Sequence, residues 1–253
     1  MFDIHVHSRF SCDSKSEMKD CIIAAAEKGL DGICITDHAE FNPTDEGYNF
    51  YNEEEYFIEF NENKKTAPIK LLSGCEIGGG PHVYPEDFER YINKPYDAVL
   101  VSVHNWYGDT FASEMAKHPI PIEESYELYW NEVLNSVLHG GFDILAHIDF
   151  PKRYYKRLLY DEKVLRLIFE IIIKKNIALE INTSTLKDLG EAMPGPDILN
   201  IYKDCGGRYV SLGSDAHIIS SIGEGFETIK PLLDGLTTVY FEKRKLIEYD
   251  YNY

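Results

Sequence analysis

The sequence opens with two histidines whose spacing suits metal binding. In the stretch "DIHVHS", Asp3, His5 and His7 alternate with two aliphatic residues. Because successive side chains of a strand point to opposite faces, these three polar groups would share one face. His5 and His7 could then chelate one metal ion, and Asp3, one step deeper, could orient a histidine by a hydrogen bond.

Similar polar groups recur at the ends of six further apolar runs. They are Asp37 and His38 in "GICITDH", Glu76 in "IKLLSGCEI", His104 in "YDAVLVSVH", His147 and Asp149 in "FDILAHIDF", Glu180 and Asn182 in "IALEINTS", and Asp215 and His217 in "RYVSLGSDAH". With His5 and His7, these clusters hold six of the nine histidines, which packing alone would hardly produce. Histidine and carboxylate without cysteine suit Zn²⁺, Fe²⁺ or Mn²⁺, so the sequence predicts a metal centre.

Stretches with helix start and stop signals separate the apolar runs. They cover residues 16–29, 122–141, 161–176 and 196–207. Strands that alternate with helices indicate parallel βαβ units. Seven such strands favour a closed or nearly closed barrel, and an open doubly wound sheet is the competing arrangement. All strands of a parallel barrel open their carboxyl ends onto one face, so the polar clusters would converge there.

Two polar stretches interrupt this pattern. Residues 42–68 are acidic and aromatic, and they predict a long loop over the barrel mouth and one amphipathic helix. Residues 105–121 predict a second long loop.

Composition narrows the class of protein. A chain of 253 residues with 44% hydrophobic content can form one large domain. Its net charge of −18 disfavours nucleic acid as a partner, although a small anionic substrate remains compatible. Neither a secretory signal nor an apolar run near the ~18 residues of a membrane span is visible. The five cysteines lack a CxxC pair and are interpreted as reduced thiols of a cytoplasmic protein. The oligomeric state is not indicated.

Six motifs taken in order resemble a known family. "DIHVHS", "ITDH", "GCEI", "VSVH", "AHIDF" and "GSDAH" resemble the polymerase and histidinol phosphatase (PHP) family, and "HIDFPKRY", "EINTSTLK" and "VYFEKRK" resemble its histidinol-phosphate phosphatase branch. The resemblance runs from Asp3 to about Lys245. It implies one PHP-type domain over residues 1–253, folded as a distorted, TIM-like, seven-stranded (β/α) barrel with two or three divalent metal ions. It also implies hydrolysis of L-histidinol phosphate, a small phosphorylated substrate, in histidine biosynthesis.

The resemblance further implies the ligands of each metal. The first would be held by His5, His7, Glu76 and Asp215, the second by Glu76, His104 and His147 with Glu76 as a bridge, and the third by Asp13, His38 and His217. Zinc, iron and manganese all occur in such sites. Catalysis would depend on His5, His7, Glu76, Asp215 and His217, since two metals can share a hydroxide that attacks phosphorus in line.

Phosphate would need basic side chains beside the metals. Lys152, Arg153 and Lys187 follow the fifth and sixth strands and are the candidates, with Arg9 a weaker one. Lys187 occupies a stretch where the branch usually has glycine followed by Leu-Arg. Asp37 or Asp149 could protonate the leaving group. The "GGG" at 78–80 lacks the spacing of a phosphate-binding loop and is interpreted as a flexible loop.

Three alternative functions remain open. The protein could be a PHP enzyme for another small phosphoester, such as a nucleotide, a sugar phosphate or a phosphotyrosine. An amidohydrolase also begins with HxH, but it typically bridges its metals with a lysine for which no counterpart is visible here. A non-catalytic metal-binding protein is the third alternative, and the full ligand set argues against it.

Overall fold

Each of the seven apolar runs contains a strand in the computed structural model, which describes residues 1–107 and 110–251. The strands are β1 (Phe2–Val6), β2 (Gly32–Ile35), β4 (Lys70–Ile77), β5 (Ala98–Val101), β8 (Ile144–Leu145), β9 (Ala178–Asn182) and β10 (Tyr209–Gly213). Neighbours in this series pair in parallel, and their order in the sheet follows their order in the chain. The chain has an α/β fold with a mostly parallel sheet.

Three more strands extend the sheet. The short β3 (His38–Ala39) pairs with the end of β4, β11 (Thr237–Glu242) runs parallel to β10, and β12 (Lys245–Tyr249) runs antiparallel to β11. The described sheet has ten strands: nine lie on a path that leads from β1 to β12 without closing, and β3 lies off this path beside β4. A closed barrel of seven strands is therefore not confirmed.

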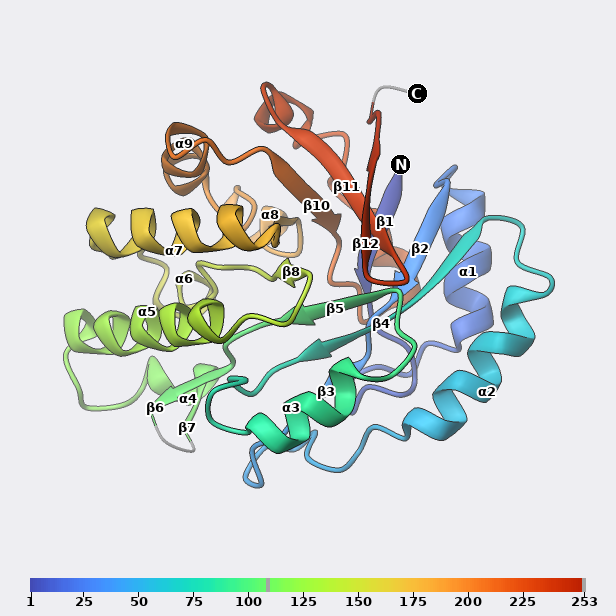
Figure 1. Cartoon of the computed structure of the whole chain (residues 1–253), viewed down its shortest axis with the longest axis horizontal. Helices are drawn as coiled ribbons and strands as arrows, with labels where there is room; N and C mark the ends of the chain where they lie inside the picture. Colours follow the sequence, from blue (N-terminus) through green and yellow to red (C-terminus); the bar gives the residue numbers. More distant parts are fainter. Residues whose placement is uncertain (108–109, 252–253) are drawn as a thin grey trace.

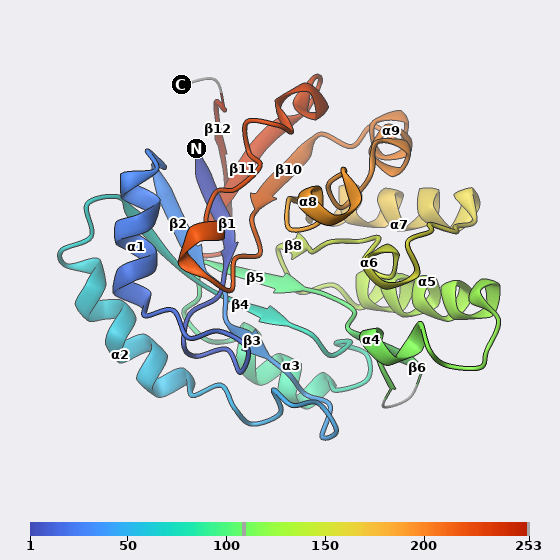
Figure 2. The same cartoon turned by 180° about the vertical axis from the view of Figure 1, so that it is seen from behind.

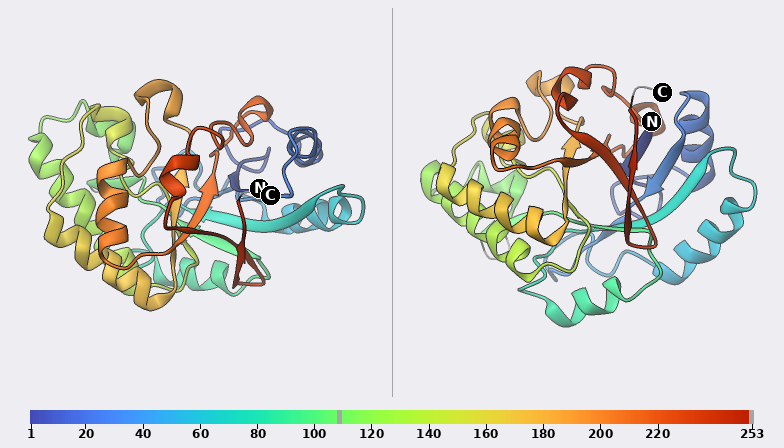
Figure 3. Two further views of the ribbon diagram at one scale, coloured as in Figure 1. Left: turned by 90° about the horizontal axis from the view of Figure 1, so that it is seen from above. Right: turned by 45° about the horizontal axis from the view of Figure 1, so that its top comes forward.

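The two ends of the parallel series nevertheless meet. The Asp215 N–H donates to His5 O at 2.8 Å, and the His7 N–H donates to Ala216 O at 3.0 Å. Val6 and Ala216 form an isolated parallel bridge, just beyond the end of β10 at Gly213. Figure 3 shows the sheet curving so that β1 and β10 lie side by side. We call this contact the β1–β10 seam.

Helices surround the curved sheet (Figures 1 and 2). The longer ones are α1 (Met18–Glu27), α2 (Glu53–Lys64), α3 (Pro85–Ile92), α5 (Ile122–His139), α7 (Glu162–Lys175) and α9 (Pro196–Asp204). The four predicted helices are confirmed as α1, α5, α7 and α9. For α7, the Asp161 side chain accepts the Lys163 N–H at the start, and Asn176 adopts a left-handed conformation at the end. None of the helices among the described residues is long and apolar enough to cross a membrane.

The strands are buried on both faces, which explains their continuous apolar runs. The larger core contains the helix side chains that pack on the sheet. A smaller core joins Phe2, Ile4, Leu72 and Ala178 to Val239 and Phe241 of β11. Phe2 also stacks on Tyr240, with ring centroids 4.3 Å apart. The β11–β12 hairpin thus seals the smaller core.

The turn of this hairpin is attached to the amino-terminal ends of β5 and β8. The backbone N–H of Lys243 donates to Asp97 Oδ1 at 3.0 Å, and that of Arg244 donates to Asp97 O at 2.9 Å. The Arg244 guanidinium pairs with Asp143 and donates to Gly141 O at 2.7 Å. The opposite, carboxyl-terminal edge of the sheet is left for the polar clusters.

The two interrupting stretches differ in outcome. Residues 42–68 contain α2, as predicted. Residues 105–121, predicted as a second long loop, contain β6 (Asn105–Tyr107), β7 (Thr110–Phe111) and the short α4 (Ala112–Met115). The Trp106 indole is buried and donates to Ser125 Oγ at 2.9 Å, which ties this segment to α5.

Candidate metal centre

The polar ends of the strands meet around Glu76 on β4. Its Oε1 lies 2.9 Å from His147 Nε2 and 3.4 Å from His104 Nε2. Its Oε2 lies 3.2 Å from His5 Nε2 and 3.5 Å from His7 Nε2. Glu76 therefore stands between two pairs of histidines, where one carboxylate could be shared by two cations.

Asp215 lies beside His5 of β1 and His7, which directly follows this strand. Its Oδ1 lies 3.3 Å from His7 Nε2 and 3.8 Å from His5 Nε2, and its Oδ2 lies 3.0 Å from the Arg153 guanidinium. The backbone of Asp215 has a φ of 53°, in the left-handed region that aspartate tolerates better than most residues. This conformation accompanies the turn that brings the carboxylate towards β1.

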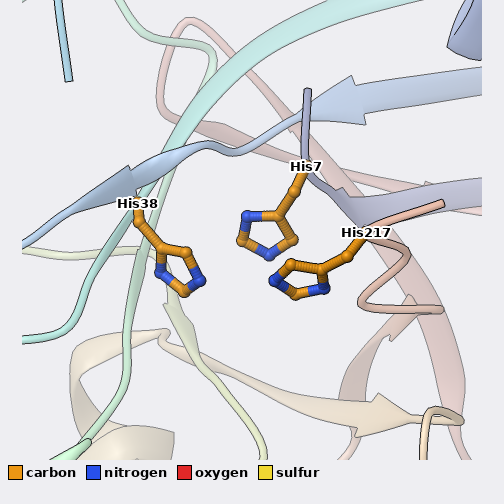
Figure 4. A group of neighbouring side chains, drawn as sticks. All are labelled: His7, His38 and His217. Carbon is orange, nitrogen blue, oxygen red and sulfur yellow. The ribbon is translucent and has the colours of Figure 1, made fainter. Parts of the chain in front are cut away.

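Asp13, His38 and His217 form a third group beside the first. Asp13 Oδ2 lies 3.0 Å from His217 Nε2 and 3.7 Å from His38 Nε2. The rings of His38 and His217 also stack on His7, with centroids 4.3 and 4.1 Å away. Figure 4 shows these three rings reaching one another from three separate segments. All nine ligands that the resemblance implies are thus brought into one cluster.

The electrostatics of the cluster favour a cation. Burial alone would raise the pKa of the Glu76 carboxyl, but His5, His38 and other histidines hold it well below its usual range. Burial would lower the pKa of His5 and His38, yet Glu76 and other carboxylates raise both well above the usual value. The carboxylates are therefore ionised, and the site attracts positive charge.

Several buried nitrogen atoms fit a bound metal. His5 Nε2 and His7 Nε2 are buried and make no hydrogen bond with any residue that the structure describes. Burial, with His217 and His38 nearby, holds the pKa of His7 well below its usual range. A neutral imidazole with an unused nitrogen is the form that coordinates metal, and an unpaired buried polar atom is otherwise costly. Together with the carboxylates, these atoms match the donor set of a divalent transition metal.

Neighbouring side chains contact the ring nitrogens of His5 and His7 that point away from Glu76, which we call the outer nitrogens. His5 Nδ1 lies 2.6 Å from Glu180 Oε1 on β9, and His7 Nδ1 lies 2.9 Å from Ser11 Oγ. Asp3 does not orient a ring as predicted. It accepts from the N–H groups of Ser214 and Gly223 and from the Ser214 hydroxyl instead. The physical reason is a register shift in the β1–β2 pairing between Asp3 and Val6, which breaks the regular alternation.

Glu180→Gln is expected to weaken metal retention about 10- to 100-fold, the usual effect of losing a carboxylate behind a metal-binding histidine. Glu180 Oε2 accepts the His147 N–H at 2.7 Å, and Oε1 faces His5 Nδ1. A glutamine would replace one of these oxygens by an NH₂ group, which would then face an N–H donor. Metal per chain during titration with a chelator measures the change. Glu170→Gln, at an exposed position on α7, is the matched control, and wild-type retention in Glu180→Gln would refute the assignment.

The cluster opens into a cavity of about 480 Å³. Arg153 is the only arginine or lysine among the described residues that line it. The Arg153 guanidinium also donates to Ser184 Oγ at 2.6 Å, which fixes its direction. It is thus placed where a phosphoryl group could contact both a guanidinium and the metal-ligand cluster.

The other predicted substrate residues do not line this cavity. Lys152 is buried and contacts Asp149 Oδ2 at 2.7 Å and Glu191 Oε1 at 3.0 Å. Lys187 is 73% exposed and pairs with Glu224 at 2.6 Å. Arg9, the weaker candidate, pairs with Glu17 at 3.1 Å and also does not line the cavity.

The two proposed proton donors are also absent from the described lining. Asp149 is fully buried and accepts the Gly195 N–H at 3.0 Å. Asp37 is fully buried and accepts from Ser8 and Ser11. Ser11 also contacts His7, so Asp37 supports this ring through a hydroxyl group.

One residue of the cluster was missed from the sequence. Glu40 follows β3, and its Oε1 lies 3.0 Å from His104 Nδ1 and 3.3 Å from His38 Nδ1. The signal that could have found it is its spacing, two residues after His38 in "TDHAE". In a strand that spacing returns a side chain to the same face.

The fold and the cluster define an α/β protein with a candidate metal centre. The model of the PHP domain matches residues 3–184, and relatives above 30% identity match nearly the whole chain. The chain belongs to the PHP family.

Individual relatives are similar over most of their length. A probable histidinol-phosphatase of Clostridium acetobutylicum is 34% identical and aligns with 96% of this chain and 98% of its own. One of Thermotoga maritima is 33% identical over 90% of this chain and 89% of its own. Among solved structures, histidinol phosphate phosphatase from Lactococcus lactis, complexed with zinc, L-histidinol and phosphate, superposes with a TM-score of 0.83 at 29% identity. It covers 97% of this chain and 98% of its own.

Proposed function

We propose that this protein hydrolyses L-histidinol phosphate to L-histidinol and phosphate, using two or three divalent metal ions. The observation that carries the proposal is the position of Glu76 between two histidine pairs, at a cavity that Arg153 also lines. The similarity to a histidinol phosphate phosphatase that holds zinc, L-histidinol and phosphate supports the choice of substrate.

The metal positions follow the groups described above. His5, His7, Asp215 and Glu76 would hold one ion, Glu76, His104 and His147 a second, and Asp13, His38 and His217 a third. Bound metal ions supply an activated water at neutral pH and stabilise charge on the phosphoryl oxygens. Zinc has the support of the Lactococcus lactis structure, and iron and manganese fit the same donors.

Arg153 would bind the phosphoryl group. Its guanidinium can form two parallel hydrogen bonds to phosphate oxygens, and its bonds to Asp215 and Ser184 hold it at the cavity before substrate arrives. The finer fold and location belong to the same proposal: a single domain over residues 1–253, seven parallel strands as a distorted barrel joined at the β1–β10 seam, and a cytoplasmic enzyme of histidine biosynthesis.

Phosphate release is the direct test. The metal-loaded protein is assayed with L-histidinol phosphate and with a panel of nucleotides, sugar phosphates and phosphotyrosine. Release from none of them, with metal bound, would contradict a phosphatase. A preference of about 100-fold for another monoester would contradict only the substrate.

Arg153→Lys is expected to raise KM for L-histidinol phosphate about tenfold with metal content unchanged. Lysine keeps the charge but cannot make the paired bonds, and a tenfold change equals about 1.4 kcal/mol, the size of one bond to a charged group. Steady-state kinetics and metal analysis measure the two effects. Lys187→Ala is the comparison, expected to leave KM unchanged because Lys187 faces solvent. A raised KM in Lys187→Ala alone would reverse the assignment.

A further inference from the structure

Glu40 stands between two histidines that the proposed function assigns to different metals. Its Oε1 lies 3.0 Å from His104 Nδ1 and 3.3 Å from His38 Nδ1, and its side chain is only 4% exposed. The other nitrogens of the two rings face elsewhere: His104 Nε2 lies 3.4 Å from Glu76 Oε1, and His38 Nε2 lies 3.7 Å from Asp13 Oδ2. This oxygen forms a hydrogen bond with His104 Nδ1, whereas His38 Nδ1 lies near it without a hydrogen bond to any described residue.

A neutral imidazole carries its hydrogen on one nitrogen and its lone pair on the other. A carboxylate that accepts from Nδ1 leaves Nε2 as the metal-binding atom and fixes the plane of the ring. For His38, Nδ1 also lies 3.0 Å from Glu76 Oε2, so two carboxylates flank it. For His104, Nδ1 forms its hydrogen bond with Glu40.

We propose that Glu40 is a positioning residue that sets the tautomer and direction of His104, and so supports metal binding at the second position. This inference rests on the metal positions of the proposed function. The position formed by His5, His7 and Asp215 does not depend on Glu40, because their outer contacts are to other residues.

Gly78 provides the space for this carboxylate. A Cβ atom at residue 78 would lie 2.1 Å from Glu40 Oε2 and 2.2 Å from Oε1, far inside contact distance. The carbonyl of Gly78 also accepts the His104 N–H at 3.5 Å. The first glycine of "GGG" thus lets the backbone lie directly against the Glu40 carboxylate, where any larger residue would clash.

The test is metal retention in Glu40→Gln, measured on the full chain loaded with Zn²⁺ and titrated with a chelator. We expect about 10- to 100-fold weaker retention of the ion at the second position, with the ion at the first position held as in the wild type. Glu46→Gln is the matched control, because Glu46 lines the same cavity but its side chain is exposed. Equal losses in both variants would overturn the inference, since total charge would then be the cause.

Gly78→Ala tests the same contact without changing charge. It is expected to displace the carboxylate and reproduce the metal loss of Glu40→Gln. Thermal unfolding of the metal-free protein shows whether Gly78→Ala folds. If it does not fold, the result for Glu40→Gln alone tests the inference. Wild-type retention in Glu40→Gln would refute the inference and leave the proposed function standing. Failure of the wild type to retain Zn²⁺ would instead refute the metal centre itself.

Discussion

Asp215→Asn is expected to lower kcat/KM for L-histidinol phosphate by at least about 100-fold and to release metal, while the chain stays folded. Losing a partner behind a metal-binding histidine already costs 10- to 100-fold, and a direct ligand contributes more. Asp215 Oδ1 faces His5 and His7, and a neutral amide oxygen would attract a cation less strongly there. Asparagine also adopts positive φ readily, so the backbone turn at residue 215 is kept.

Metal analysis, kinetics and circular dichroism together check this result. Asp204→Asn makes the same chemical change at a 68% exposed position on α9 and should behave as the wild type. Full activity in Asp215→Asn would remove Asp215 from the metal centre. Loss of activity with loss of secondary structure would instead indicate that the β1–β10 seam had failed.

Glu76→Gln is expected to release metal from more than one position. Asp215 Oδ1 faces His5 and His7, whereas Glu76 faces these two histidines with one oxygen and His104 and His147 with the other. The glutamine amide keeps one oxygen but places an NH₂ group where the second oxygen stood. One of the two histidine pairs, His5 with His7 or His104 with His147, therefore loses the ligand that it shares with the other. We expect kcat/KM to fall by at least about 100-fold, and further than in Asp215→Asn.

The number of metal ions per chain separates the two variants. After equal loading with Zn²⁺, Glu76→Gln should retain fewer ions than Asp215→Asn. The reverse order would mean that Glu76 is not shared between positions. Glu170→Gln is again the control, with the same change at an exposed site on α7.

The strands and most of the candidate ligands could be predicted because parallel strands impose a simple rule. A histidine at the carboxyl end of an apolar run must lie at one edge of the sheet, so His104 and His147 are predicted to meet although they are 43 positions apart in the chain. The helices were predictable for a local reason: Asp161 and Pro196 mark helix starts whatever the tertiary structure.

Other features depend on contacts that no local pattern encodes. The spacing of Glu40 after His38 hints at a shared face, but its contact with His104 is set by tertiary structure. Lys152 and Arg153 are neighbours in sequence, yet one is taken up by a buried ion pair with Asp149 and the other reaches the cavity. The β1–β10 seam also depends on tertiary structure, because its backbone hydrogen bonds join segments from opposite ends of the chain.

The β1–β10 seam joins residues that are synthesised at the beginning and near the end of translation. Asp3 and Ser214, which it brings together, are 211 positions apart, and the carboxylate of Asp215 follows directly. On the ribosome, His5 and His7 therefore emerge long before the strand that completes their surroundings. A nascent chain that stops before residue 215 contains both histidines and Glu76 but lacks the carboxylate of Asp215. The candidate metal centre can therefore be completed only after nearly the whole chain has been translated.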